Sequence, residues 1–389
     1  MTHSVTDSTA ETGFALPTAI FALVVVGVLV TGGFILTTQE TRISQSTERG
    51  TAALYLAESG IGTVVQDWEN ARFMALALWE TDSVAGSDGQ GEWQVEVRRI
   101  GNQLFFLSGR GEITHGGAHA RARREVGVVA RALSLNIDIN GALTTRGDVG
   151  LVGQAQISGL DVEPPSWGGA CDGSLEDTPG VITTPGSEVS TSGGAEVTGD
   201  PEYGSPSVDY DDSLDDETFT VFGDLTWDDL VQMANITRGP GTINNTGPNV
   251  VDGECVPADW NWGDPENPDA PCGSYFPVIH VSGDVSIQSA GVGQGILLVD
   301  GDLSLQGDFI FHGIIIAQGT VSTYGGGPRI YGGVMASNAT LENENTYGGS
   351  SQIQYSSCSV QRTLMNANNV IRLRPIVQRN WVDLSSLAF

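Results

Sequence analysis

An almost wholly apolar, uncharged run from Phe14 to Thr38 places the strongest constraint on the fold of this chain. A helix rises about 1.5 Å per residue, so a helical run of this length can cross a hydrocarbon core of about 30 Å. Between Glu40 and Asn70, apolar residues recur at three- and four-residue steps, which is the pattern of an amphipathic helix. The sequence therefore predicts one long N-terminal helix, continuous through both halves.

Three interpretations of this N-terminus compete. A cleaved secretory signal has a basic start and a shorter apolar core. The first twelve residues here carry Asp7 and Glu11 but no Lys or Arg, and the apolar run is longer than a signal core, which argues against that class. A plain membrane anchor remains, together with an interpretation that rests on resemblance.

The segment TGFALPTAIFALVVVGVLVTGGFILTTQE resembles the N-terminus of type IV pilins, and TAALYLAESGI (51–61) resembles minor pilins of the PilX type. The resemblance implies cleavage by a prepilin peptidase between Gly13 and Phe14, with methylation of the new N-terminus. Thr18 stands where most major pilins carry Glu, a departure seen in some minor and tip pilins, and the leader lacks the usual basic residues. The residues implied for the membrane and filament helix are Phe14, Leu16, Phe21, Val25, Leu29, Phe34 and Leu36.

The charge balance is strongly acidic. The 389 residues have a formal net charge of −30, and all 17 basic residues are Arg. Such a surface repels nucleic acid, so no nucleic-acid partner is expected. The resemblance implies other pilins, the inner-membrane pilus assembly machinery and prepilin peptidase as partners, and membrane lipid before assembly. The expected location is the cell envelope, as a single-pass membrane protein with an extracytoplasmic head.

Four cysteines in a chain expected to be exported favour two disulfides, although spacing alone does not fix the connectivity. Cys255 and Cys272 bracket a loop rich in Pro and Asp and are the expected first pair, which leaves Cys171 and Cys358 as the second. Four free thiols are the alternative.

After the helix the pattern changes to strands. Apolar and polar residues alternate over 92–98, 103–108 and 123–131, which predicts a small antiparallel sheet. Eight of the 17 arginines lie between Arg98 and Arg146. They form either a solvated strand face or a basic patch that docks on acidic neighbours, and the first is the more common use of such runs.

Glycines recur every six residues in the second half, at positions 295, 301, 307, 313, 319 and 325. Within each hexad the third and fifth residues are mostly apolar, as in a short half-buried strand. Three hexads make one coil of 18 residues, and segments beginning at Val278, Ile296 and Ile314 align at that step. The pattern predicts a β-solenoid, whose coils bury their apolar rows only when stacked. A β-sandwich is the competing architecture.

The fold class expected is α+β, with a predominantly β head. Its parts are a leader (1–13), the pilin helix (14–70), a small antiparallel β region (71–133), first solenoid coils (134–160), an acidic Pro-rich insertion (161–277), the main solenoid (278–360) and a C-terminal cap (361–389). The insertion holds 24 of the 47 acidic residues and 13 of the 16 prolines, which predicts loops, with one short helix at 227–234 capped by Thr226.

No cofactor is expected, although Ca²⁺ has one candidate loop in the insertion. Asp259, Asn261, Asp264 and Asn267 offer oxygen ligands at short steps, but the spacing is not that of an EF-hand. Turn chemistry explains the same residues. Six aromatic residues of the insertion form either a contact surface or buried loop anchors: Tyr203, Tyr210, Trp260, Trp262, Tyr275 and Phe276.

Enzyme motifs are scarce, so no catalytic residue is assigned. Asp284, Asp302 and Asp308 could line the face of a polysaccharide-cleaving solenoid, but each follows a glycine, where Asp is a common turn former. The expected function is that of a minor pilin-like structural subunit, used in assembly, priming, adhesion or display. Two alternatives stay open: a membrane-anchored surface adhesin that never enters a filament, and a bactofilin-like solenoid polymer.

Overall fold

The computed structural model describes residues 15–89, 91–114, 122–169, 171, 176–288, 290–337, 345–347, 350–366, 373–376 and 381–385. The chain divides into two compact units. Unit 1 combines residues 1–68, 75–131 and 375–389, and unit 2 combines residues 69–74 and 132–374. A long N-terminal helix is followed by a predominantly β region with an antiparallel sheet, so the predicted α+β fold class is confirmed.

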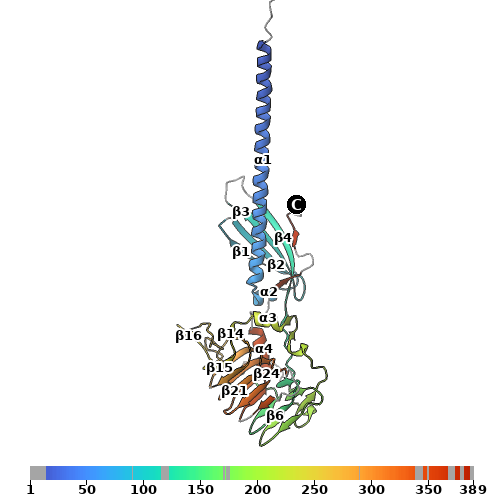
Figure 1. Cartoon of the computed structure of the whole chain (residues 1–389), viewed down its shortest axis with the longest axis vertical. Coiled ribbons are helices and arrows are strands. Elements are labelled where there is room, and N and C mark those ends of the chain that lie inside the picture. Colours follow the sequence, from blue (N-terminus) through green and yellow to red (C-terminus); the bar gives the residue numbers. More distant parts are fainter. Residues whose placement is uncertain are drawn as a thin grey trace, which may run out of the picture. The chain divides into compact units, whose positions relative to one another are not determined.

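Unit 1 contains the helix α1 (Ala15–Gln66) and an antiparallel sheet (Figure 1). The sheet strands are β1 (Thr81–Ser87), β2 (Gly91–Arg99), β3 (Leu104–Ile113) and β4 (Ala122–Ala132), and β28 (Trp381–Asp383) pairs with β4. The three strands that alternation predicted correspond to β2, β3 and β4. The sequence TDSVAGS of β1 has a single large apolar residue, so it carries no alternation to detect.

The second half of α1 packs on β2 and β3 through a row of buried residues: Ala53, Leu56, Ala57, Ile61 and Val64. Two glycines of β3 allow this close approach. A Cβ at Gly111 would lie 2.2 Å from the carbonyl oxygen of Ala53, and one at Gly109 would lie 2.7 Å from that of Ala57. Only glycine fits where backbone meets backbone at this distance.

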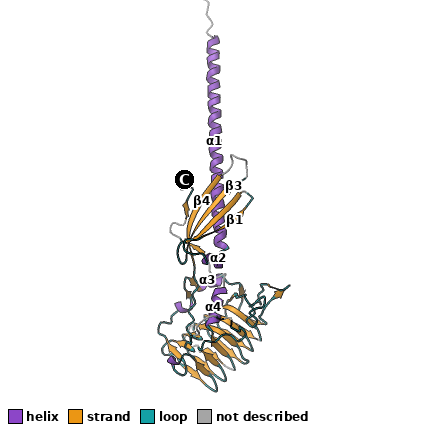
Figure 2. Ribbon diagram, turned by 180° about the vertical axis from the view of Figure 1, so that it is seen from behind, coloured by secondary structure: helices purple, strands orange, loops and turns teal. Residues whose placement is uncertain are grey.

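Unit 2 is a stack of parallel strands in two sheets (Figure 2). The path of the first sheet is β10 (Glu196–Thr198), β7 (Gln156–Ser158), β26 (Gln352–Tyr355), β24 (Arg329–Ala336), β22 (Ile310–Ala317), β20 (Val292–Val299), β18 (Val278–Val281) and β14 (Ile236–Arg238), with β5 (Leu143–Thr145), β8 (Val181–Thr183) and β11 (Val208–Tyr210) off this path. The path of the second is β15 (Gly241–Asn244), β19 (Val285–Gln288), β21 (Leu303–Gln306), β23 (Val321–Tyr324), β25 (Asn345–Tyr347), β6 (Val149–Leu151) and β9 (Val189–Thr191).

The strand register confirms the predicted step of 18 residues. Val278 pairs with Ile296 and Ile296 with Ile314, while Val285 pairs with Leu303 and Leu303 with Val321. Each of these side chains is buried, so the apolar rows of successive 18-residue repeats, here called coils, form one continuous core. This is the stacking that a coil needs because it cannot bury its row alone.

Each 18-residue step contains two strands rather than the three that the hexads predicted. Gly295 and Gly313 lie inside β20 and β22, at φ of +108° and +135°, and strand pairing continues through them. A Cβ at Gly313 would lie 2.2 Å from the carbonyl oxygen of Gly295. Glycine here bends a strand without ending it, because positive φ and close stacking are both open to a residue without Cβ.

The order of the coils differs from the order of the chain. β24 pairs with both β26 and β5, so residues 143–158 stack directly against the last coils. The segment 161–277, expected to be an insertion of loops, supplies strands to both ends of the stack: β8 to β11 at one and β14 and β15 at the other.

The expected end of the chain also differs. The alignment extended coils to residue 360, whereas the helix α4 (Ser357–Asn366) follows β26 and packs on β20, β22 and β24. The C-terminal segment was expected to cap the solenoid, but residues 375–389 belong to unit 1 and β28 pairs with β4. Its short strands carry too weak an alternation for the sequence to select a partner sheet.

The remaining elements are short. They are α2 (Asn70–Met74), α3 (Trp227–Gln232), the 3₁₀ helices at Pro201–Tyr203 and Glu217–Phe219, the hairpins β12 (Val221–Phe222) with β13 (Leu225–Thr226) and β16 (Val250–Val251) with β17 (Glu254–Cys255), and β27 (Leu373–Pro375). Thr226 caps α3 as predicted, in a reciprocal capping box with Asp229. Hydrogen bonds from the backbone N–H and hydroxyl of Thr226 hold the pKa of Asp229 below its usual value.

Candidate functional site

The first half of α1 presents an apolar surface that nothing in the described structure covers. The span Thr18–Gln66 contains an 18-residue window with a mean hydropathy of 2.7, and none of that window is buried. Phe21, Leu29 and Phe34 are each about 70% exposed, and Val25 and Leu36 are exposed as well. An uninterrupted apolar surface of this kind is stable in lipid or against other apolar helices, and unstable in water.

The cleavage site implied by the resemblance lies outside the described residues. Gly13 and Phe14 precede the first described residue, Ala15, and the side chain of Leu16 is not described either. The processing of the N-terminus therefore remains a prediction from the sequence.

The arginines of unit 1 lie among hydrogen-bond acceptors and carboxylates of their own sheet. Arg110 lies 3.8 Å from Glu112 and Arg123 lies 3.3 Å from Glu125, while Arg99 donates to the carbonyl oxygen of Leu76. Arg98 and Arg131 donate to the side chains of Thr81 and Gln103. These internal contacts favour a solvated face of mixed charge over a basic docking patch.

The aspartates considered for a catalytic face connect neighbouring coils. Asp284 Oδ1 accepts from the backbone N–H of Asp302 at 2.9 Å, Asp302 Oδ1 from that of Thr320 at 2.7 Å, and Asp308 Oδ1 from that of Gly327 at 3.1 Å. Each carboxylate thus satisfies a turn amide of the next coil. This structural role accounts for the Gly-Asp pairs of the hexads without catalysis.

The calcium-candidate loop is held by its own hydrogen bonds. Asn261 is fully buried; its amide nitrogen donates to the carbonyl oxygen of Val256 and its amide oxygen accepts from the N–H of Gly263. Asp264 accepts from the side chain of Asn267, and Asp259 lies exposed, 3.9 Å from Arg238. Within the described residues, no group of three or more His, Cys, Asp or Glu is placed to hold a metal ion. The side chains of Asn261, Asp264 and Asn267 thus hold the loop. The carboxylate of Asp259 has Arg238 as its only ion-pair partner among the described residues.

The aromatic residues of 161–277 divide between burial and exposure. Trp262 and Phe276 are buried, and Trp262 packs edge-on against Phe309. Trp260, Tyr210 and Tyr203 are exposed. These three residues lie on separate segments of unit 2. The six aromatic residues are therefore neither all part of a contact surface nor all buried loop anchors.

Both disulfides join the expected partners. Cys255 pairs with Cys272 and Cys171 with Cys358, a separation of 187 residues. The second bridge ties the segment that contains Trp167 to the helix α4. The bridge therefore links Cys171 to a helix that packs on β20, β22 and β24 of the first sheet.

A buried histidine lies against Trp167, and no sequence motif indicates it. His312 of β22 is 1% exposed and contacts the rings of Trp167 and Tyr331 edge-on, at centroid distances of 5.3 and 5.1 Å. Its Nδ1 has no hydrogen-bond partner among the described residues. Burial, with a smaller contribution from Arg329, lowers the pKa of His312 to about 3, so the ring is neutral at physiological pH.

Replacing His312 by phenylalanine is expected to reduce the acid sensitivity of unit 2. The folded pKa is about 3 and the unfolded pKa is 6.5, so the unfolded state binds the proton first as the pH falls below 6.5. Between pH 7 and pH 5 the parent should lose about 2 kcal/mol of stability through this group, which the variant should retain. Urea unfolding at the two pH values measures the difference; equal pH dependence in parent and variant would contradict the assignment.

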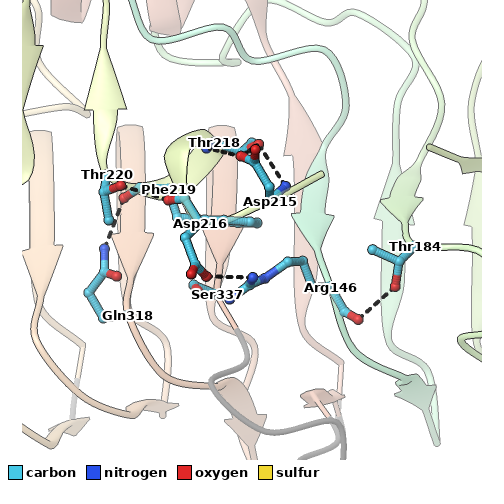
Figure 3. Close-up of polar contacts among 9 residues, drawn as sticks. All are labelled: Arg146, Thr184, Asp215, Asp216, Thr218, Phe219, Thr220, Gln318 and Ser337. Carbon is cyan, nitrogen blue, oxygen red and sulfur yellow. Dashed lines mark hydrogen bonds and ion pairs between the residues drawn. The ribbon is translucent and has the colours of Figure 1, made fainter. Parts of the chain in front are cut away.

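A second feature missed by sequence inspection is the side chain of Arg146, which braces the segment 215–220 against the sheets (Figure 3). It donates to Asp216 at 2.6 Å and to the hydroxyl of Ser337 at 3.0 Å, and its guanidinium lies 5.5 Å from the centre of the Phe219 ring. Gln318 donates to the carbonyl oxygen of Phe219. The two hydrogen-bond partners of Arg146 are 70 and 191 residues away in the chain, so no local sequence pattern predicts these contacts.

Arg146→Met is expected to destabilise unit 2 by about 2 kcal/mol, because it removes the bond to Ser337 and the packing on Phe219 together with the ion pair. Asp216→Asn is the matched control. Its carboxylate is 83% exposed, and exposed ion pairs contribute little, so a change within about 0.5 kcal/mol is expected. Chemical denaturation measures both; equal effects would show that Arg146 acts only through Asp216.

Among known proteins we report one solved structure to which the chain bears a distant likeness. No family model and no curated protein matches the chain. Among solved structures it is similar to the competence-associated pilin ComZ from Thermus thermophilus, with 13% identity over 86% of this chain and 97% of that chain, at a TM-score of 0.23. Likeness at this level establishes neither fold nor function, so both are inferred from the residues of this chain.

Proposed function

We propose that the chain is a pilin-like structural subunit of the cell envelope, anchored in a membrane by the first half of α1 before the same helix enters a filament. The observation that carries the proposal is the division of α1. Its first half is apolar and exposed, and its second half packs on an antiparallel sheet through Ala53, Ala57 and Ile61. A helix built this way can exchange lipid for neighbouring helices at low cost while the acidic remainder stays in water.

The finer assignment is a minor subunit of the PilX type with a β-solenoid head. The motif around Gly13 and Phe14, Thr18 at the fifth mature position and the segment 51–61 support it. The bulk of unit 2 argues against close lateral packing as a major subunit. Assembly priming, adhesion or display are the roles that fit, with other pilins, the inner-membrane assembly machinery and prepilin peptidase as partners.

The role we propose is not catalytic. The acidic residues most open to a hydrolytic role, Asp284, Asp302 and Asp308, each accept a hydrogen bond from a backbone N–H in the next coil. Their carboxylates are thereby committed to the turns of the stack.

An anchored surface protein that never enters a filament is the second candidate. The same exposed apolar half of α1 favours it, because lipid alone satisfies that surface. A bactofilin-like polymer is less well supported, since end-to-end assembly of parallel coils gives no role to an exposed apolar helix.

The N-terminal mass of the protein purified from its own envelope separates these candidates. A chain that begins at Phe14, with a methylated amino group, supports pilin processing. A chain that begins at Met1 or Thr2, in cells with an active prepilin peptidase, would contradict the filament proposal. It would support the anchored surface protein instead.

A further inference from the structure

A cavity of about 260 Å³ opens in unit 2 beside the segment braced by Arg146. One wall is the extended segment 135–140, in which Ile137 and Ile139 are buried. The alternation turns the polar side chains before, between and after these two residues toward the cavity: Asn136, Asp138 and Asn140. This wall thus carries two amides and a carboxylate on one side of an extended backbone.

A second wall is the segment 211–218, and its own hydrogen bonds hold it in place without a ligand. Asp211 donates its N–H to the carbonyl oxygen of Thr183 in β8. The backbone N–H and hydroxyl of Ser213 donate to Asp211 Oδ1 at 2.8 and 2.7 Å, and Asp215 and Thr218 exchange hydrogen bonds. A wall fixed by its own bonds loses little entropy when it binds a ligand.

The cavity offers acceptors above an apolar floor. Asp138 Oδ1 accepts from Asn136 and Asp211 Oδ1 from Ser213, whereas the second carboxylate oxygen of each aspartate accepts no hydrogen bond within the described part of the chain. Hydrogen bonding from Ser213 holds the pKa of Asp211 below its usual value, so this acceptor stays ionised at neutral pH. The apolar floor has partly exposed surface from Val221 and from Leu214, which belongs to the second wall.

These features select a ligand class. Among the described residues that line the cavity there is no Lys, Arg or His, and there are two carboxylates, so an anionic ligand would be repelled. Two carboxylates without a third acidic, His or Cys partner in the described chain are a sparse set for a metal ion. A hydroxyl-rich ring fits instead: its O–H groups donate to the carboxylates, its oxygens accept from the amides, and its C–H faces cover the apolar floor.

We propose that this cavity binds one neutral saccharide ring, presented as a free sugar or as the end of a glycan. The two walls supply directional acceptors and the floor supplies the apolar contact. The volume limits the site to a single ring, so the affinity of one site should be in the millimolar range, roughly what few ligand atoms allow. The inference is independent of filament assembly.

The test uses the full chain in a detergent without a sugar headgroup, and saturation-transfer NMR with the methyl glycosides of glucose, galactose, mannose and N-acetylglucosamine. At least one glycoside should receive saturation from the parent. Asp138→Asn and Asp211→Asn should each weaken its binding about tenfold, because a hydrogen bond to a charged acceptor becomes one to a neutral acceptor.

Asp252→Asn is the matched control, since Asp252 is exposed at the tip of the β16–β17 hairpin, away from the cavity, and has a φ of +52° that Asn tolerates. It should bind as the parent does. Asn140→Trp, which places a bulky ring at an exposed position of the wall, should abolish transfer while the melting temperature stays unchanged.

Three outcomes would overturn the proposal. They are the absence of transfer to all four glycosides, equal binding by the parent and both aspartate variants, and calcium binding that is lost in Asp138→Asn without any glycoside signal. A glycan-terminal source is distinguished from a free sugar by repeating the titration with the matching disaccharide, which binds only if one end of the cavity leaves room for the second ring.

Discussion

Replacing Gly313 by alanine is expected to destabilise unit 2 by roughly 4 kcal/mol, although the change adds one methyl group. The new Cβ would lie 2.2 Å from the carbonyl oxygen of Gly295 and 2.7 Å from the hydroxyl of Thr363 on α4. The backbone φ of +135° is also unfavourable for alanine. Neither neighbour can move alone, because Gly295 belongs to the adjacent coil and α4 is tied down by the Cys171–Cys358 bridge.

Gly239→Ala is the matched control for this change. Gly239 is exposed in unit 2, its φ is not in the left-handed region, and no described atom lies within 4 Å of the position that a methyl group would take there. Its unfolding free energy should stay within about 0.5 kcal/mol of the parent. Urea denaturation measures the unfolding free energy of both variants. If Gly313→Ala is as stable as Gly239→Ala, then β22 does not stack closely on β20 at the Gly295–Gly313 pair.

The sequence predicts best those features that depend on a local, periodic pattern of residues. The length of α1 follows from an uncharged run and from three- and four-residue steps. The 18-residue register follows from apolar pairs such as Leu297 and Val299 that recur in each coil. Thr226 and Asp229 form a capping box within four residues, so that signal is also local.

What the sequence could not predict depends on contacts between distant segments. The pairing of β24 with β5 joins Val334 to Leu143, and every coil shares the same apolar alternation, so sequence offers no rule for which coils become neighbours. The sequence also does not indicate that the stack ends at α4. Residues 352–355 alternate as the other strands do, and only the residues after them form a helix.

The candidate sites show the same division. The exposed apolar half of α1 was visible in composition alone. The cavity between 135–140 and 211–218 was not, since its acceptors Asp138 and Asp211 lie in segments that look like ordinary acidic loops until the fold brings them together. The burial of His312 depends on Trp167, which the second disulfide holds from outside the coil repeat.

Replacing Leu29 by aspartate is expected to remove the chain from filaments and to weaken its membrane association. Leu29 is 69% exposed and lies within the apolar run. A carboxylate near the centre of a membrane helix makes the free energy of insertion less favourable by about 3 kcal/mol. In a filament, the new carboxylate would lie between apolar helices without a positively charged partner, because residues 14–38 contain no basic residue. The amount of the variant recovered in filaments should therefore fall by more than about tenfold.

Ile43→Asp is the matched control, because it makes the same kind of change at 66% exposure on the same helix, beyond the first charged residue, Glu40. It should leave membrane recovery near that of the parent.

The measurement is immunodetection of each variant in membrane and sheared-filament fractions. Loss of Leu29→Asp from filaments with partial retention in the membrane supports exchange of lipid for neighbouring helices. Recovery of both variants at parental levels in both fractions would show that the apolar half of α1 serves neither purpose. Equal loss of both would show that the whole helix, rather than its uncharged run, is the surface that assembles.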